Sequence, residues 1–229
     1  MEAQLGIPMN GAPAPDFRDW EIKSHQVRNF ARPGVGKVTL FTPEPDSGAY
    51  AEFGVNWFVE HFGVLNDAHN RYDFTGTHHV SALPHAKTGL TLNLVGYDRT
   101  TKTIQADGRV VLLAPNGGEV SAWTFAKLLT HWQRKHARAA YVPAQSQIGP
   151  PKAYRYGNRI QLAEGTRFDK FLDAMADGYV VYDPGIKSEL LPSGRWRAKA
   201  RSQFRIDFRA LGALYDDVTE IDVLATKGA

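Results

Sequence analysis

Hydrophobic and polar positions alternate with a period of two along much of the chain, which is the pattern of half-buried β-strands. In segment 17–23 the apolar residues Trp20 and Ile22 alternate with acidic and basic residues. Similar or more continuous apolar runs predict strands over 37–42, 72–80, 90–97, 103–113, 139–142, 158–162 and 179–182, with further strand and turn structure over 203–224. The runs at 90–97 and 103–113 are close enough in sequence to form a hairpin.

Three other segments carry apolar side chains at intervals of three and four residues, which predicts amphipathic helices. Ser121 is expected to cap the second helix and Thr166 the third, since both residue types favour helix N-termini. The basic end of the second helix, residues 134–138, is explained by the helix dipole. The three apolar faces comprise Tyr50, Phe53, Trp57, Phe58 and Phe62; Phe125, Leu128, Leu129 and Trp132; and Phe168, Phe171, Leu172 and Met175.

This mixture of strands and helices predicts an α/β or mixed α+β fold. A Gly/Pro break at 148–151 is the only segment that suggests a division between two lobes. We therefore expect one lobe over residues 1–148 and a second over 149–229, with the C-terminal segment returning to the core of the first.

Composition narrows the kind of protein. The chain has 229 residues, of which 43% are hydrophobic and 22% charged, and this fits a globular protein. It contains no cysteine, so disulfides, thiolate zinc sites and cysteine nucleophiles are excluded. No apolar run approaches the length of a membrane span, and the first residues lack the pattern of a secretory signal. We expect a soluble, cytoplasmic protein with no membrane partner.

One short segment has the pattern of a catalytic metal site. Glu21 and Lys23 are two residues apart on the predicted strand, so they project from the same face about 7 Å apart. Asp16 lies just before the strand and can turn back toward that face. Two carboxylates and the carbonyl of Ile22 would form the oxygen site that Mg²⁺ prefers. A neighbouring lysine can hold or deprotonate a metal-bound water, as phosphodiester hydrolysis requires.

A structural interpretation of this segment remains open, because Glu-x-Lys is common on exposed strands, where it forms a solvated face. The aspartate that precedes the glutamate by five residues, directly after Pro15, reduces the chance of coincidence.

The sequence Pro15-Asp16-x4-Glu21-x-Lys23 resembles the motif of the PD-(D/E)XK nuclease superfamily. A longer set of segments is similar to the MvaI/BcnI branch of restriction endonucleases and covers nearly the whole chain. These segments are Leu5-Gly6-Ile7, Trp20-Glu21-Ile22-Lys23-Ser24, Leu40-Phe41-Thr42-Pro43-Glu44-Pro45, Trp123-Thr124-Phe125, Lys135-His136, Tyr141-Val142-Pro143, Glu164-Gly165-Thr166, Tyr182-Asp183-Pro184-Gly185 and Phe204-Arg205-Ile206.

The resemblance implies a restriction-endonuclease-like core, with a central mixed sheet flanked by helices, and a second lobe that helps to enclose duplex DNA. Residues 1–148 would form the catalytic lobe and 149–229 the recognition lobe. Asp16 and Glu21 would bind Mg²⁺, for which Mn²⁺ could substitute, and Lys23 would serve the attacking water. The resemblance also implies a monomer that leaves 5′-phosphate ends, and a companion DNA methyltransferase.

The MutH mismatch-repair nicking enzyme is a more distant relative in this resemblance. Its first helix carries Leu-Glu followed shortly by Leu-Gly, and residues 1–6 here are similar, which makes Glu2 a candidate accessory metal ligand. A frayed terminal residue is the alternative interpretation of Glu2. Relatives carry further helical structure before this point, which leaves open whether the start of the chain is truncated or shortened.

A basic stretch near the C-terminus is the predicted DNA-binding surface. It holds six cations against one acid, with Trp196 and Phe204 interleaved. A solvated basic strand that balances the acidic residues at 216–222 is the alternative. The cations are Arg195, Arg197, Lys199, Arg201, Arg205 and Arg209.

His25 should share the face of Lys23, where it would either approach the DNA or form hydrogen bonds at the surface. Taken together, these patterns predict a Mg²⁺-dependent type II restriction endonuclease that cuts double-stranded DNA at a short specific site. Two other functions remain open, namely a MutH-like enzyme that nicks one strand and an inactive nuclease-fold module that only binds DNA.

Overall fold

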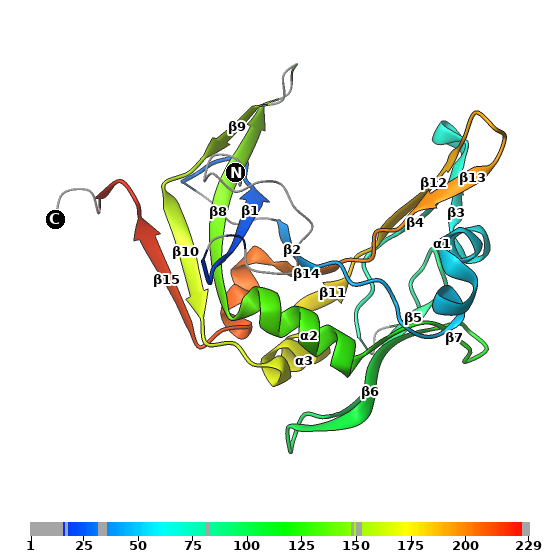
Figure 1. Ribbon diagram of the computed structural model, residues 1–229, viewed down its shortest axis with the longest axis horizontal. Helices are drawn as coiled ribbons and strands as arrows, with labels where there is room; N and C mark the ends of the chain where they lie inside the picture. The colour runs from blue at the N-terminus through cyan, green and yellow to red at the C-terminus, as the bar shows by residue number, and fades with distance from the viewer. Residues whose placement is uncertain are drawn as a thin grey trace. The chain divides into compact units, whose positions relative to one another are not determined.

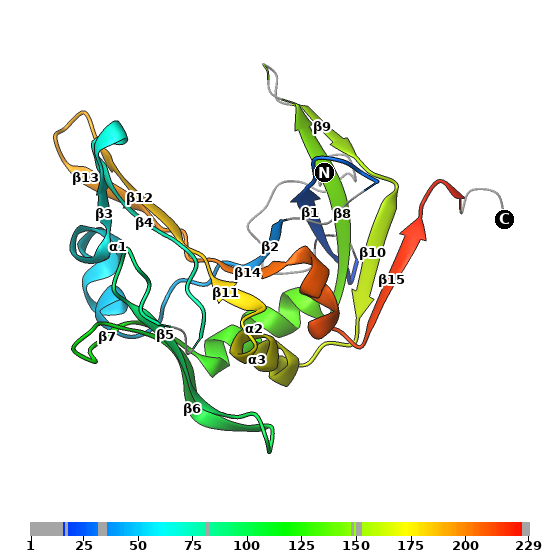
Figure 2. The ribbon, with the colours of Figure 1, turned by 180° about the vertical axis from the view of Figure 1, so that it is seen from behind.

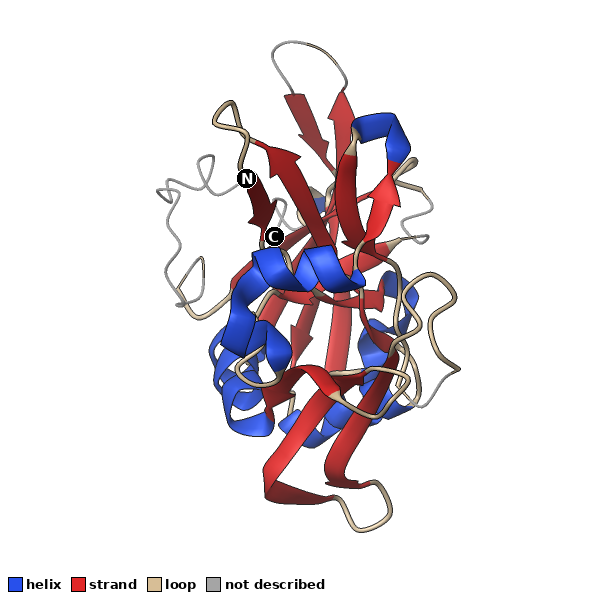
Figure 3. Cartoon of the chain, turned by 90° about the vertical axis from the view of Figure 1, so that its right-hand side faces the viewer, coloured by secondary structure: helices blue, strands red, loops and turns tan. Residues whose placement is uncertain are grey.

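The computed structural model describes residues 16, 18–31, 36–80, 83–147, 149 and 153–225. Within these ranges strands predominate and helices are few, as the predicted mixed α+β class requires (Figure 3). No helix in the described part of the chain is both long and apolar enough to span a membrane.

The strands are β1 (Glu21–Gln26), β2 (Lys37–Phe41), β3 (Val64–Asn66), β4 (Arg71–Thr75), β5 (Thr91–Asp98), β6 (Thr103–Leu113), β7 (Glu119–Thr124), β8 (Arg138–Gln147), β9 (Ala153–Tyr156), β10 (Arg159–Glu164), β11 (Val180–Tyr182), β12 (Gly185–Leu190), β13 (Trp196–Lys199), β14 (Phe204–Asp207) and β15 (Asp217–Asp222). The helices are α1 (Ala49–Phe62), α2 (Phe125–His136) and α3 (Phe168–Ala176), with short 3₁₀ helices at Asp67–His69 and Phe208–Ala213.

The chain forms two compact units, and each of them is built from separate stretches of sequence. Unit 1 contains the described residues before Thr39, Thr130–Phe171 and those from Ile206 onward. Unit 2 contains Thr39–Leu129 and Leu172–Arg205. The chain passes from one unit to the other within β2, α2, α3 and β14.

These units do not coincide with the predicted segments 1–148 and 149–229. The Gly/Pro break at 148–151 lies between β8 and β9, which pair antiparallel from Ala144↔Tyr156 to Gln147↔Ala153. The break therefore interrupts a hairpin inside unit 1, and the turn-forming residues that suggested a linker join two neighbouring strands.

A mixed sheet forms the centre of unit 1, with strand order β1-β8-β10-β15 (Figures 1 and 2). β1 runs parallel to β8, with Glu21 opposite Ala139, and the other pairs in this order are antiparallel. β8 is longer than the predicted 139–142 strand and largely buried, as expected of a central strand with an apolar run.

Side chains from α2 and α3 that belong to unit 1 pack together, with the rings of Trp132 and Phe171 4.9 Å apart. Thr166 does not cap α3, so that prediction was wrong. Its hydroxyl donates to the carbonyl of Leu214 at 2.5 Å and accepts from Trp132 Nε1 at 3.2 Å. The helix begins at Phe168, so Arg167 rather than Thr166 directly precedes it.

Unit 2 contains the antiparallel sheets β13-β12-β4-β3 and β5-β6-β7, and most of the sheet β11-β14-β2. The predicted hairpin is confirmed as β5 and β6. Ser121 does not cap α2, because it lies buried within β7 and pairs with Leu112. The helix begins at Phe125, and the hydroxyl of Thr124 accepts from the backbone N–H of Lys127 at 3.3 Å.

The aromatic face predicted for residues 50–62 is only partly buried. Tyr50 and Phe58 lie in the core of unit 2, whereas Phe53 is 53% exposed. Gly54 has a φ of 83° and interrupts α1, so the residues on its two sides do not share one continuous helical face.

Candidate active site

The first strand brings the predicted acidic and basic residues together. Glu21 and Lys23 lie on the same face of β1, and Lys23 Nζ is 2.9 Å from Glu21 Oε1. Only 5% of the glutamate side chain and 12% of the lysine side chain are exposed. The pair is therefore not the solvated strand face that the structural interpretation required.

Asp16 turns back onto this strand. Its Oδ2 accepts the backbone N–H of Ile22 at 3.0 Å. Arg18 allows the turn by adopting a φ of 55°, and β1 consequently begins at Glu21 rather than at residue 17 as predicted. Asp16 thus contacts the residue between Glu21 and Lys23, and its charge also acts on Lys23.

A second lysine reaches the same carboxylate from α2. Lys135 Nζ lies 3.5 Å from Glu21 Oε1. α2 leads directly into β8, which pairs with β1, so the last turn of this helix comes beside the start of β1. The helix dipole, which was the sequence-based explanation of the basic helix end, does not account for this contact.

Charge is crowded in this cluster. Burial lowers the pKa of Lys23 below its ordinary value, the Lys135 cation lowers it further, and the Glu21 carboxylate opposes both effects. Glu21 Oε2 is buried and has no hydrogen-bond partner among the described residues. A buried carboxylate oxygen without a donor is costly, and it is the kind of oxygen that a hard cation binds.

Two tyrosines and a histidine form a buried chain beside this cluster. Tyr141 is the partner of Lys23 in the β1–β8 register, and its hydroxyl lies 2.8 Å from that of Tyr215. His136 Nδ1 is 3.1 Å from the Tyr215 hydroxyl. Burial raises the pKa of both tyrosines, so they remain neutral beside Glu21.

His25 lies on the same strand face but is buried, so the predicted hydrogen bonding at the surface was wrong. Its ring stacks on Phe208 with centroids 3.9 Å apart. Neither ring nitrogen has a hydrogen-bond partner in the described ranges, and burial lowers its pKa to about 4. A neutral ring packed in this way carries no charge toward DNA near neutral pH.

The basic stretch is divided between several elements. Arg197 pairs with Glu189, and Arg205 pairs with Asp183, both within unit 2. Arg209 pairs with Asp207 in unit 1. The remaining cations are exposed and have no carboxylate partner among the described residues; they are Arg195, Lys199 and Arg201. The stretch is therefore not the uniform basic surface that its composition suggested.

Glu2 lies outside the described residues. Among those that are described, no three His, Asp or Glu side chains converge as a metal-binding group. The candidate oxygen ligands within this part are Asp16, Glu21 and the backbone of Ile22.

Comparisons with known proteins add a family and a fold. The model of the MvaI/BcnI restriction endonuclease family matches residues 1–215. The structure of restriction endonuclease MvaI with its cognate DNA substrate aligns with a TM-score of 0.71 at 19% identity, covering 96% of this chain and 85% of that one. MvaI in the absence of DNA aligns with a TM-score of 0.58 at 18% identity, covering 96% and 82%. A comparison with curated protein sequences gave no match. The predicted restriction-endonuclease-like fold is thereby confirmed.

Proposed function

Because the chain belongs to the MvaI/BcnI restriction endonuclease family, it is an endodeoxyribonuclease, and we propose that it cuts double-stranded DNA at a short specific sequence with Mg²⁺. Family and fold support a type II restriction endonuclease. The DNA substrate in the solved MvaI complex supports a duplex as the ligand of this chain as well. Unit 1, which holds the acidic and basic cluster, would be the catalytic unit.

The cluster on β1 fits a divalent metal ion. Asp16, Glu21 and the carbonyl of Ile22 would hold it, and the unpartnered Glu21 Oε2 supports this assignment. A bound Mg²⁺, or Mn²⁺ in its place, would stabilise charge on the phosphate and acidify a water. Glu2 remains a candidate accessory ligand.

Lys23 would position the attacking water and accept its proton. Its lowered pKa favours the neutral amine that a base requires. Lys135, whose Nζ lies 3.5 Å from Glu21 Oε1, would place a second positive charge beside the phosphate. In-line attack by the water would break the bond to the 3′ oxygen and leave a 5′-phosphate and a 3′-hydroxyl.

The observation that carries this proposal is the contact of Asp16 with the backbone of Ile22, between the paired residues Glu21 and Lys23 of β1. In the Lys23→Ala variant we expect plasmid cleavage with Mg²⁺ to fall by about 10²–10⁴-fold, the usual contribution of a positioned acid or base. Duplex binding in Ca²⁺, measured without cleavage, should stay near that of the parent protein.

Lys170→Ala is a matched control, because Lys170 also pairs with a carboxylate in unit 1, that of Asp216 at 2.6 Å. It should cleave like the parent. Parental cleavage by the Lys23→Ala variant would eliminate the proposed mechanism.

The same digestion separates the remaining possibilities. A final linear product with fixed ends supports a site-specific endonuclease, whereas a reaction that stops at the open-circular product supports a MutH-like nicking enzyme. Binding without cleavage at any divalent metal concentration supports an inactive module. We further propose that the protein acts as a monomer, one strand at a time, alongside a DNA methyltransferase.

A further inference from the structure

Three buried polar side chains beside the acidic and basic cluster have no role in the mechanism proposed above. They are His136 at the end of α2, Tyr141 on β8 and Tyr215 after the second 3₁₀ helix. The most exposed of them, Tyr215, is only 3% exposed. The Tyr215 hydroxyl lies 3.1 Å from His136 Nδ1 and 2.8 Å from the Tyr141 hydroxyl, so Tyr215 connects the other two.

The two ends of this chain of hydrogen bonds lie next to the two lysines that contact Glu21. His136 directly follows Lys135 in the sequence. Tyr141 is opposite Lys23 in the parallel register of β1 and β8, and paired residues of neighbouring strands project from the same face of a sheet. Burial raises the pKa of both tyrosines and the charge of Glu21 adds to this effect, which places their hydroxyls near that carboxylate.

A second set of hydrogen bonds ties the last turn of α2 to the same C-terminal segment. Trp132 Nε1 donates to Thr166 Oγ1 at 3.2 Å, and this hydroxyl donates to the carbonyl of Leu214 at 2.5 Å. The Trp132 ring also stacks on His136, with centroids 4.2 Å apart. The end of the helix is therefore held at two points, one before and one after Lys135.

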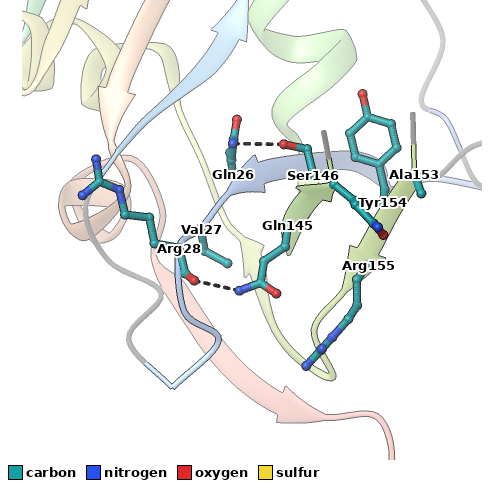
Figure 4. Close-up of a pocket in the computed structure, with 9 residues that line it drawn as sticks. Gln26, Val27, Arg28, Gln145, Ser146, Ala153, Tyr154 and Arg155 are labelled. Atoms are coloured by element: carbon teal, nitrogen blue, oxygen red, sulfur yellow. Dashed lines mark hydrogen bonds between the residues drawn. The ribbon is translucent and has the colours of Figure 1, made fainter. Parts of the chain in front are cut away.

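β1 is held to β8 independently of the helix, because every residue of β1 is paired with that strand. Side-chain hydrogen bonds extend this attachment beyond the paired residues (Figure 4). Gln26 Nε2 donates to Ser146 Oγ at 3.1 Å. Gln145 Nε2 donates to the carbonyl of Arg28 at 2.8 Å. The sheet thus fixes the side chains of β1, whereas the position of Lys135 depends on the end of α2.

A small rotation of the helix end would displace Lys135 from the site. Side chains reach about 5–6 Å from the axis of an α-helix, so a rotation of about 10° moves their ends by about 1 Å. A displacement of about 1 Å can cost about 10²-fold in rate. The Lys135 side chain is 28% exposed, so its 3.5 Å approach to Glu21 depends on a backbone that is held in place.

We propose that Tyr215 is a positioning residue of the nuclease site, whose hydroxyl holds Lys135 in place against Glu21. It does so through its two hydrogen-bonded neighbours, His136 and Tyr141. The inference rests on the proposed nuclease function, and it assigns a catalytic effect to a buried hydroxyl that acts only through the lysine.

The test is a double-mutant cycle between Tyr215→Phe and Lys135→Met. The phenylalanine ring fills the same space, so the first variant removes the hydroxyl alone. Its single-turnover cleavage of duplex DNA with Mg²⁺ should fall by about 10-fold, within the range for groups that orient the residues of a metal site. In the Lys135→Met background the same change should alter the rate by less than about twofold, because the lysine that it positions is absent.

Metal binding without cleavage gives a second readout. In calorimetric titration with Ca²⁺ in the absence of DNA, the Lys135→Met variant should bind more tightly than the parent, because a repelling cation has left the site. Tyr215→Phe should tighten Ca²⁺ binding by a smaller factor, and it should add nothing in the double variant. A tyrosine that served only folding would leave the Ca²⁺ affinity unchanged.

Two controls separate positioning from a general loss of hydrogen bonding. Tyr97→Phe removes a hydroxyl that donates to Asp173 at 2.8 Å in unit 2, and this variant should cleave like the parent. His136→Asn keeps a polar atom close to the position of Nδ1 and should retain most of the rate. His136→Leu should lose as much rate as Tyr215→Phe.

An equal fractional loss of rate from Tyr215→Phe in both backgrounds, in a parent that cleaves with Mg²⁺, overturns the positioning role and leaves the nuclease proposal standing. An unchanged rate in the Tyr215→Phe variant overturns it in the same way. A parent that cuts no duplex at any divalent metal concentration overturns both proposals.

Discussion

Two positively charged regions of the molecule differ in how their charges are compensated. In unit 1, Lys23 and Lys135 both approach one oxygen of Glu21, and the other oxygen of that carboxylate has no partner in the described ranges. In unit 2, the much richer stretch after residue 194 pairs Arg197 and Arg205 with an acid each. The region with fewer cations thus has the less fully compensated charges. Buried charges that shift one another's pKa values are typical of catalytic sites.

The comparison teaches that a count of cations in sequence is a poor guide to function. An exposed pair such as Arg197–Glu189 contributes about 0–1 kcal/mol to the free energy of unfolding. Its two charges largely cancel, so the pair attracts a charged ligand only weakly. Glu21 and Lys23 have few alternatives, because only 5% and 12% of their side chains are exposed and neither charge can be solvated independently. Each of the following predictions tests this difference.

Replacing Glu21 by Gln should have the largest effect. The variant loses the proposed charged oxygen ligand, which is also the carboxylate that both lysines contact. We expect single-turnover cleavage with Mg²⁺ to fall by about 10³-fold or more, comparable with the loss of a principal electrostatic stabiliser. Glu189→Gln, which removes the carboxylate from the exposed pair in unit 2, should change the rate by less than about fivefold. Similar losses in both variants would erase the distinction between the regions.

Replacing Lys135 by Met should have the next largest effect. The rate at saturating Mg²⁺ should fall by about 10–100-fold, as for residues that orient metal ligands. The Mg²⁺ concentration for half-maximal rate should fall as well, because one repelling cation has left the site. A residue that served only packing would not shift the metal dependence. The matched Lys170→Met variant should leave both quantities at parental values.

The unpaired and paired cations of the basic stretch should behave differently. Replacing Arg195, Lys199 and Arg201 by Ala should lower the salt slope of duplex binding by about 2.7, at 0.9 for each phosphate contact. Removing Arg197 and Glu189 together deletes a neutral pair and should leave the slope unchanged. Equal slopes in these two variants would show that the unpaired cations do not face DNA.

The smallest effect should come from two buried histidines, His25 in unit 1 and His78 in unit 2. Burial lowers the pKa of both His25 and His78 to about 4, below the value of 6.5 expected when unfolded. Their contribution to stability is therefore complete above pH 6.5 and is lost as pH falls toward 4, by up to about 1.4 kcal/mol per pH unit for each residue.

In the His25→Leu variant, the free energy of unfolding measured with urea should decline less between pH 6.5 and 4 than in the parent. Stability at pH 7 should not be lost, since the ring nitrogens of His25 have no described partners. His78→Leu should destabilise at pH 7, because the imidazole contacts the Gly76 carbonyl and the Thr88 hydroxyl. Loss of stability at pH 7 in the His25 variant would indicate a contact with the rest of the chain.

The parts of the site that depend on local geometry were predictable from sequence. Glu21 and Lys23 share a strand face by the period of two, and Asp16 needs only a short turn to reach Ile22. Lys135 was missed because its approach depends on the parallel pairing of β1 with β8, and these two strands lie far apart in the sequence. Periodicity shows which face a residue occupies but not which strand lies beside it.

The fold class was also predictable from the periods of the apolar residues, but the boundaries of the two units were not. The Gly/Pro break has the composition of a linker, yet β8 and β9 pair across it. Ser121 was a reasonable cap by residue type, but the buried run from Val120 to Trp123 continues β7 and moves the start of α2 to Phe125. Both errors arise because tertiary pairing overrides local composition.

The four crossings of the chain between units 1 and 2 determine how the protein can be dissected. A protease that cuts once between residues 148 and 152 produces two fragments, and each fragment contributes strands to both hydrophobic cores. The nicked protein should therefore stay assembled through those cores until it is denatured. Either fragment expressed alone would expose two incomplete hydrophobic cores to water. Neither unit can therefore be obtained as an independently folded domain by a single truncation.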